Sequence, residues 1–149
     1  MEFLAVSLAG LEGSWFAQAL RTSRWGYPAL NIAHLLGIAL LFGSIVPLDL
    51  RALGLWGGVD LDTLAGVLVP AAVVGLVLAV TTGFGLFSVR ASEYGSMPLF
   101  WGKLSLLGLG AANAILVRRH GHTAIAALVS ILAWTGAIAA GRLLGYWGN

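Results

Sequence analysis

The segment from residue 27 to residue 48 is a long apolar run that constrains the fold more than any other part of the chain. At about 1.5 Å per residue in a helix, it is long enough to cross the hydrocarbon core of a bilayer. Between its two prolines, the clearly polar side chains are Asn31, His34 and Ser44. A histidine inside hydrocarbon is costly and therefore points to a functional site. His34 is the first candidate site residue.

The composition is that of a membrane protein rather than a soluble domain. Of the 149 residues, 59% are hydrophobic and 9% are charged, whereas soluble domains carry roughly a quarter charged residues. Three further runs, at about 63–88, 98–117 and 123–144, are also long and apolar enough to span a bilayer. The sequence therefore predicts an all-α integral membrane four-helix bundle, with residues 1–149 forming a single domain.

Charge and cysteine content exclude several classes of function. The net charge of +2 is too small and too scattered to indicate a nucleic-acid partner. The chain has no cysteine, which excludes disulfides, thiolate metal sites, iron–sulfur clusters and c-type haem attachment.

Residues 2–24 have the pattern of an amphipathic helix that lies in the membrane interface. With a period of about 3.6, one face carries Leu4, Leu8, Leu11, Trp15 and Ala19, and the other carries Ser7, Ser14, Gln18 and Arg21. The sequence Ala17-Gln18-Ala19 resembles a signal-peptide cleavage site. However, the basic n-region is missing and Glu12 would lie in the apolar core of such a peptide, so an interfacial helix is predicted.

Polar residues from all four predicted spans fall near the membrane face that holds both chain ends, which we call side A. His34 lies about 9 Å into the first span and Lys103 about 7 Å into the third. Arg142 is one turn from the end of the fourth span, and Thr82 enters from the second at a similar level. Asn31 lies one turn from His34 on nearly the same face. These residues predict a cationic polar layer without a carboxylate, which suits an anion or a cofactor with acidic groups.

Each of these polar residues can also have a purely structural role instead of binding a ligand. Lys103 and Arg142 can extend to the lipid headgroups, as cations near span ends commonly do. His34 can donate a hydrogen bond to a carbonyl or a threonine across the bundle. At the opposite face, side B, Asp49 and Arg51 are predicted to pair with each other.

Landmarks through most of the chain resemble an uncharacterised family of small bacterial four-helix membrane proteins. They are the run LAGLEGSWFAQALRTSRWGYPALNIAHLLGIALLFGSIVPLDLRALG, Pro70, Thr82-Gly83, Tyr94, the segment PLFWGK, Asn113, and Gly141-Arg142 with Tyr146. The family is expected to carry Glu at the position of Asn31, so an acid–base role is not carried over to that position.

A histidine in the first span and a lysine at the start of the third are also distantly similar to two other families. These are the copper-resistance D-type membrane proteins and the four-helix membrane protoporphyrinogen oxidases, which bind haem b. The resemblance implies His34 as an axial haem ligand and Lys103 as an essential basic partner. Those relatives are expected to carry further helical histidines, whereas the third span here offers Asn113. A bis-histidine haem within one bundle is therefore not expected.

Three functions follow as expectations, and whether the protein is an enzyme stays open. The first is a haem b protein of electron-transfer or porphyrin-oxidising type, with Lys103 and Arg142 paired to the propionates. The second is a non-catalytic membrane subunit that binds a lipid, a quinone or a protein partner, as a homo-oligomer or in a larger complex. The third is a small-ion transporter; for copper, two methionines supply few soft ligands. The expected location is the bacterial inner membrane, with cytoplasmic termini.

Overall fold

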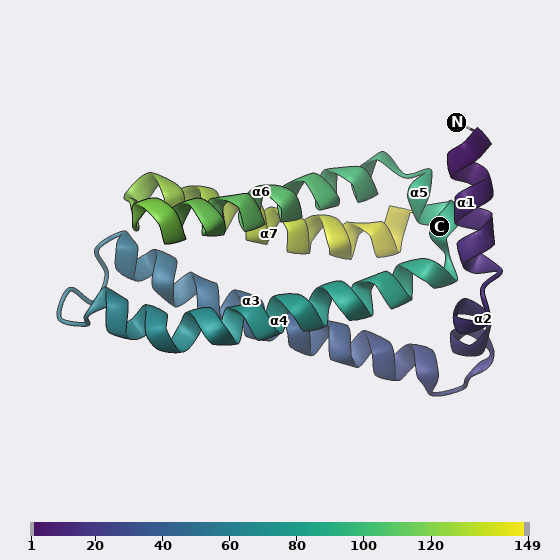
Figure 1. Cartoon of the computed structure of the whole chain (residues 1–149), viewed down its shortest axis with the longest axis horizontal. Coiled ribbons are helices and arrows are strands. Elements are labelled where there is room, and N and C mark those ends of the chain that lie inside the picture. The colour runs from purple at the N-terminus through teal and green to yellow at the C-terminus, as the bar shows by residue number, and fades with distance from the viewer. Residues whose placement is uncertain (1, 148–149) are drawn as a thin grey trace.

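The computed structural model describes residues 2–147, which form seven helices and, within that range, no strand (Figure 1). The helices are α1 (Glu2–Glu12), α2 (Trp15–Thr22), α3 (Gly26–Ala52), α4 (Leu61–Val89), α5 (Ala91–Gly95), α6 (Pro98–His120) and α7 (Ala124–Trp147). Four of them, α3, α4, α6 and α7, are long and apolar enough to cross a membrane. The predicted all-α membrane bundle is confirmed, and the protein is a multi-pass membrane protein.

The four long helices form two antiparallel pairs, α3 with α4 and α6 with α7 (Figure 1). The pairs are joined mainly by packing of α7 against α3. The core lies where Leu41 of α3, Ala72 of α4 and Trp134 of α7 meet. The helices extend past several predicted span ends, for example through Pro47 to residue 52 in α3. The predicted ends followed the apolar run, whereas the helical backbone continues into the polar interface.

Small residues set the close approach of α3 and α4. A Cβ atom on Gly37 would lie 2.6 Å from the backbone nitrogen of Ala79, and one on Gly75 would collide with the backbone of Leu41. Neither helix could hold this position with a larger side chain at these two glycines. Membrane helices gain little from hydrophobic association, so close packing of this kind is what holds them together.

The N-terminal region forms two helices rather than the one continuous helix predicted over residues 2–24. The break lies at Gly13 and Ser14, where the Ser14 hydroxyl accepts a hydrogen bond from the backbone nitrogen of Ala17 at 3.3 Å and caps α2. Serine is a strong N-cap residue, so it begins a new helix here. Both helices lie across the end of the bundle (Figure 1).

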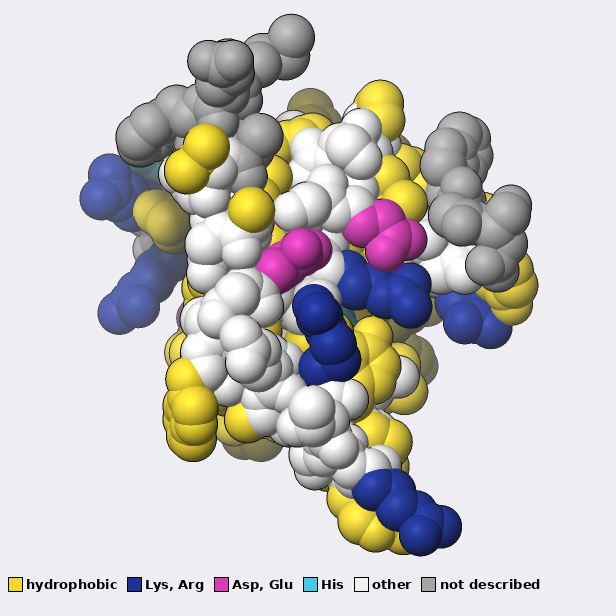
Figure 2. Space-filling model, turned by 90° about the vertical axis from the view of Figure 1, so that its right-hand side faces the viewer, with side chains coloured by type: hydrophobic (Ala, Val, Ile, Leu, Met, Phe, Trp, Pro, Cys, Tyr) yellow, Lys and Arg dark blue, Asp and Glu magenta, His cyan; other side chains and the backbone are white. Residues whose placement is uncertain are grey.

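Two long-range hydrogen bonds attach these helices to the bundle. Arg21 of α2 donates from Nη2 to the carbonyl oxygen of Val89 at the end of α4, at 2.6 Å. A carboxylate oxygen of Glu12 accepts from the backbone nitrogen of Ser92 in α5, at 2.9 Å. Figure 2 looks onto this end face and shows basic and acidic side chains gathered at its centre. The N-terminal helices are therefore a fixed part of side A.

Asp49 and Arg51 do not form the pair predicted at side B. Arg51 turns to the following loop, where its Nε donates to the carbonyl oxygen of Val59 at 2.5 Å and its Nη2 to that of Gly57 at 3.3 Å. Asp49 is buried and faces Ser130 of α7. Residues two positions apart point to different faces of a helix, which is why the prediction was wrong.

Candidate functional site

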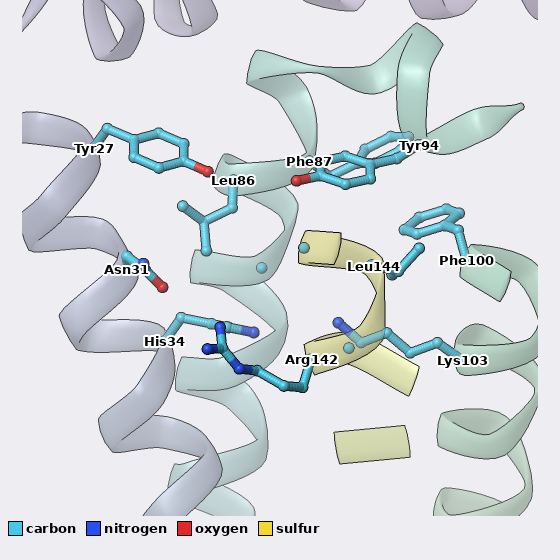
Figure 3. Close-up of a pocket in the computed structure, with 13 residues that line it drawn as sticks. Tyr27, Asn31, His34, Leu86, Phe87, Tyr94, Phe100, Lys103, Arg142 and Leu144 are labelled. Atoms are coloured by element: carbon cyan, nitrogen blue, oxygen red, sulfur yellow. The ribbon is translucent and has the colours of Figure 1, made fainter. Parts of the chain in front are cut away.

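A cavity of about 230 Å³ lies between the two helix pairs at the end where α3 and α6 begin and α7 ends (Figure 3). Its walls come from all four long helices and from α5. Asn31, His34, Lys103 and Arg142 line it. The structure thus brings four of the five predicted site residues to one cavity on side A.

His34 is held in one tautomer by a contact across the α3–α4 crossing. Its Nδ1 lies 2.8 Å from the backbone carbonyl oxygen of Ala79. A carbonyl oxygen only accepts hydrogen bonds, so Nδ1 carries the proton and donates it. In the neutral ring, Nε2 then keeps its lone pair, and Figure 3 shows the ring extending from α3 toward the centre of the cavity. A histidine that binds a metal is commonly prepared in this way.

Thr82, the fifth predicted site residue, supports His34 from behind and does not line the cavity. Its Oγ1 donates to the carbonyl oxygen of Leu78 in its own helix at 2.5 Å and lies 3.2 Å from Nδ1 of His34. Thr82 is 7% exposed. Thr82 therefore contributes to the site by helping to orient the imidazole of His34.

Gly83 has no side chain, and this leaves space for the imidazole of His34 against α4. A Cβ atom at this position would lie 2.9 Å from Cε1 and 3.3 Å from Nδ1 of His34. The ring therefore lies against the bare backbone of α4. The hydrogen bond to Ala79 and this contact together fix where Nε2 points.

Lys103 reaches the cavity from α6 by lying along the backbone of α7. A Cβ atom on Gly141 would meet Nζ of Lys103 at 3.3 Å and its Cε at 3.4 Å. Within residues 2–147, the one side-chain ion pair shorter than 4 Å joins Arg90 and Glu93, outside the cavity. The ammonium group of Lys103 thus lies in a partly buried position without a carboxylate partner in the described part of the chain.

Arg142 is the more exposed of the two cations. Its Nη2 donates to the hydroxyl of Tyr146 at 2.7 Å, and its guanidinium carbon lies 4.8 Å from the centre of that ring. Figure 3 shows the side chain extending from α7 toward α3 and His34. Arg142 therefore borders the cavity rather than filling it.

Aromatic side chains that were not predicted for the site form the opposite wall. The rings of Phe87 and Phe100 stack with centroids 4.8 Å apart, and Tyr94 lies against Phe100 at 6.2 Å. Burial raises the pKa of the Tyr94 phenol, and the neighbouring phenol of Tyr27 raises it further. Both phenols line the cavity. The wall encloses the cavity with flat apolar surfaces and neutral hydroxyl groups.

A sequence signal was present for only one of these aromatic residues. Tyr27, Asn31 and His34 are spaced i, i+4 and i+7, so they share one face of α3. That spacing predicts Tyr27 as a member of the site. Phe87, Tyr94 and Phe100 come from three different helices, and no local pattern in the sequence connects them.

The donor set determines what the cavity can do chemically. Two cations and one imidazole lone pair face it, and no carboxylate lines it. The described residues contain no group of three histidine, cysteine or carboxylate side chains able to hold a metal ion. The site can therefore bind an anionic group, or supply one axial ligand to a metal that a cofactor already holds.

Fold and cavity together define a multi-pass four-helix membrane protein with a cationic cavity near one membrane face. No protein-family model, curated protein or solved structure matches the chain. The class of this protein accordingly rests on its own residues and their arrangement.

Proposed function

We propose that the cavity binds an acidic, ring-bearing cofactor, with haem b as the candidate that uses all three polar groups. The observation that supports the proposal most strongly is the tautomer and orientation of the His34 imidazole. Its Nδ1–H donates to Ala79, and its Nε2 lone pair is left for the cavity. An imidazole prepared in this way suits axial ligation of iron.

The charges of the cavity support an acidic cofactor. Lys103 and Arg142 come from different helices and approach without carboxylate partners in the described part of the chain. Each can form a charge-assisted hydrogen bond with a propionate, which is stronger than a neutral one. The stacked rings of Phe87 and Phe100 offer a flat apolar surface to a macrocycle.

The size of the cavity requires part of the site to move. Cofactor pockets commonly measure about 300–1,000 Å³, and this cavity measures about 230 Å³. Arg142 is the exposed lining cation, so its side chain has room to adjust when a larger ligand enters. Haem b supplies one-electron chemistry when bound. The chain itself would orient the ring, pair its acidic groups and limit access of water.

The test is the visible absorption spectrum of the detergent-purified protein, expressed with added haem precursor, first oxidised and then reduced with dithionite. We expect a Soret band and reduced α and β bands that disappear in His34→Ala. His120→Ala is the matched control, because that histidine is exposed at the far end of α6 and should leave the spectrum unchanged. A chromophore that survives in His34→Ala would show that the ligand assignment is wrong.

The second candidate is a non-catalytic binding site. Its ligand would be either the anionic headgroup of a lipid or the polar head of a quinone-like amphiphile. The observation that favours it is the small cavity next to two cations, which fits a headgroup better than a complete macrocycle. A colourless protein under the conditions above would support this candidate. Native mass spectrometry would then detect an acidic lipid that is retained by the wild type and lost in Lys103→Ala.

A further inference from the structure

A second polar site lies near side B, between α3 and α7. Asp49 is 8% exposed, and its Oδ2 has no hydrogen-bond partner among the described residues. The hydroxyl of Ser130 on α7 is its polar neighbour, and Ser130 is itself 5% exposed. Asp49 comes 15 residues after His34, about 22 Å along the helix. This site is therefore separate from the side A cavity and does not depend on what binds there.

No countercharge from residues 2–147 pairs with this carboxyl group. Arg51 is held by the carbonyl oxygens of Val59 and Gly57 in the loop. On α7, the one charged residue in the described part is Arg142, at the opposite end of the bundle. Asp62 lies in the first turn of α4, and Arg118, Arg119 and His120 lie at the end of α6. None of them forms an ion pair with Asp49.

An unpaired carboxylate between membrane helices is strongly disfavoured, because the charge loses its water and gains no partner. A bound proton removes the charge and adds a donor, which an oxygen of Ser130 can accept. Ionisable residues inside membrane bundles commonly mark proton pathways and binding sites. We propose that Asp49, with Ser130, is a proton-binding site at the contact of α3 with α7.

Proton occupancy of Asp49 is coupled to the packing of α3 against α7. The protonated acid is neutral and lets the two helices stay in contact at this level. Loss of the proton places a bare charge in the same contact, and the helices must part or admit water. The site therefore links the local proton concentration to the main contact surface between the two helix pairs.

Chemical labelling of the full chain in lipid nanodiscs tests the proposal. Dicyclohexylcarbodiimide is an apolar reagent that modifies protonated carboxyl groups. We expect a modified peptide that contains Asp49 at mildly acidic pH and declining modification as the pH rises. Asp49→Asn should abolish this product, whereas Asp62→Asn, which changes an exposed carboxyl group in the first turn of α4, should retain it.

Infrared spectroscopy on the same samples decides the question where the reagent does not reach the group. We expect the wild type to show the carbonyl stretching band of a neutral carboxylic acid at mildly acidic pH, and Asp49→Asn to lack it. Asparagine has nearly the same shape as the protonated acid, so the variant should fold. Identical carboxyl spectra for wild type and Asp49→Asn at mildly acidic pH would overturn the proposal, whatever the labelling result.

Discussion

His34 on α3 donates a hydrogen bond of 2.8 Å to the backbone carbonyl oxygen of Ala79 on α4. The close crossing of the two helices makes this contact possible. Gly37, one turn beyond His34, lies directly against the backbone of the same Ala79. Packing and site geometry are thus coupled, because the glycine that brings the helices together also brings the acceptor within reach of the imidazole.

The first prediction concerns this crossing. Gly37→Leu forces a side chain against the backbone of Ala79, and overpacking of this kind destabilises by about 1–3 kcal/mol. We expect a lower midpoint of unfolding in detergent, followed by circular dichroism. Gly43→Leu is the control on the same helix, because a Cβ there has nothing within 4 Å. Equal midpoints for the two variants would mean that α3 and α4 do not cross at Gly37.

The second prediction concerns the orientation of the imidazole. Gly83→Ala adds a Cβ atom that would lie 2.9 Å from Cε1 of His34, so the ring must turn or α4 must shift. We expect the nitrogen NMR signals of the His34 ring to move. In Gly66→Ala, which adds a methyl group to an open position on the same helix, they should stay in place. Unchanged ring signals in Gly83→Ala would show that the imidazole does not rest on α4.

The third prediction compares two side chains at opposite ends of α6, Lys103 and His120. Hydrogen bonds to charged groups contribute about 1.5–3 kcal/mol, so Lys103→Ala should weaken retention of an acidic ligand by about tenfold or more. His120→Ala should change retention little, because that side chain is exposed and does not line the side A cavity. Retention is measured by the fraction of ligand left after detergent washing. Equal losses from the two variants would place the ligand elsewhere.

The fourth prediction concerns pH. Burial, and then the neighbouring phenol of Tyr27, raise the pKa of Tyr94 above the ordinary value of about 10. The folded protein therefore favours the protonated phenol, and the resulting stabilisation is present below pH of about 10 and is lost as the pH rises through the folded pKa. Phenolate absorbance of the wild type minus that of Tyr94→Phe should show a late titration. A difference curve centred at or below the ordinary value would contradict the burial of this phenol.

Much of this architecture could be predicted from the sequence because a membrane-spanning helix is defined by the length and hydropathy of one continuous segment. About 20 consecutive apolar residues suffice to specify a span, and four such runs specify a bundle. Depth along a span is also local information, since each residue adds about 1.5 Å. For that reason Asn31, His34, Lys103 and Arg142 could be assigned to one layer before their neighbours were known.

The direction in which each side chain points was decided by the tertiary structure. Depth gives no angle around the helix axis, so the sequence could not separate Thr82, which lies behind His34, from residues that line the cavity. It also gave Asp49 the wrong partner, because the contact of α3 with α7 turns that carboxyl group inward. The aromatic wall of Phe87, Tyr94 and Phe100 exists only where three helices meet.

The residues alone were enough to predict a four-helix membrane protein with a cationic polar layer near the face of its chain ends. Hydropathy and rise per residue are properties of single segments, and they need no knowledge of neighbours. The orientation of His34 Nε2 toward a cavity, and the enclosure of Asp49 without a countercharge from the described residues, became visible only in the folded bundle. Both depend on how closely helices approach and which faces they turn to one another, which is set by packing between distant residues.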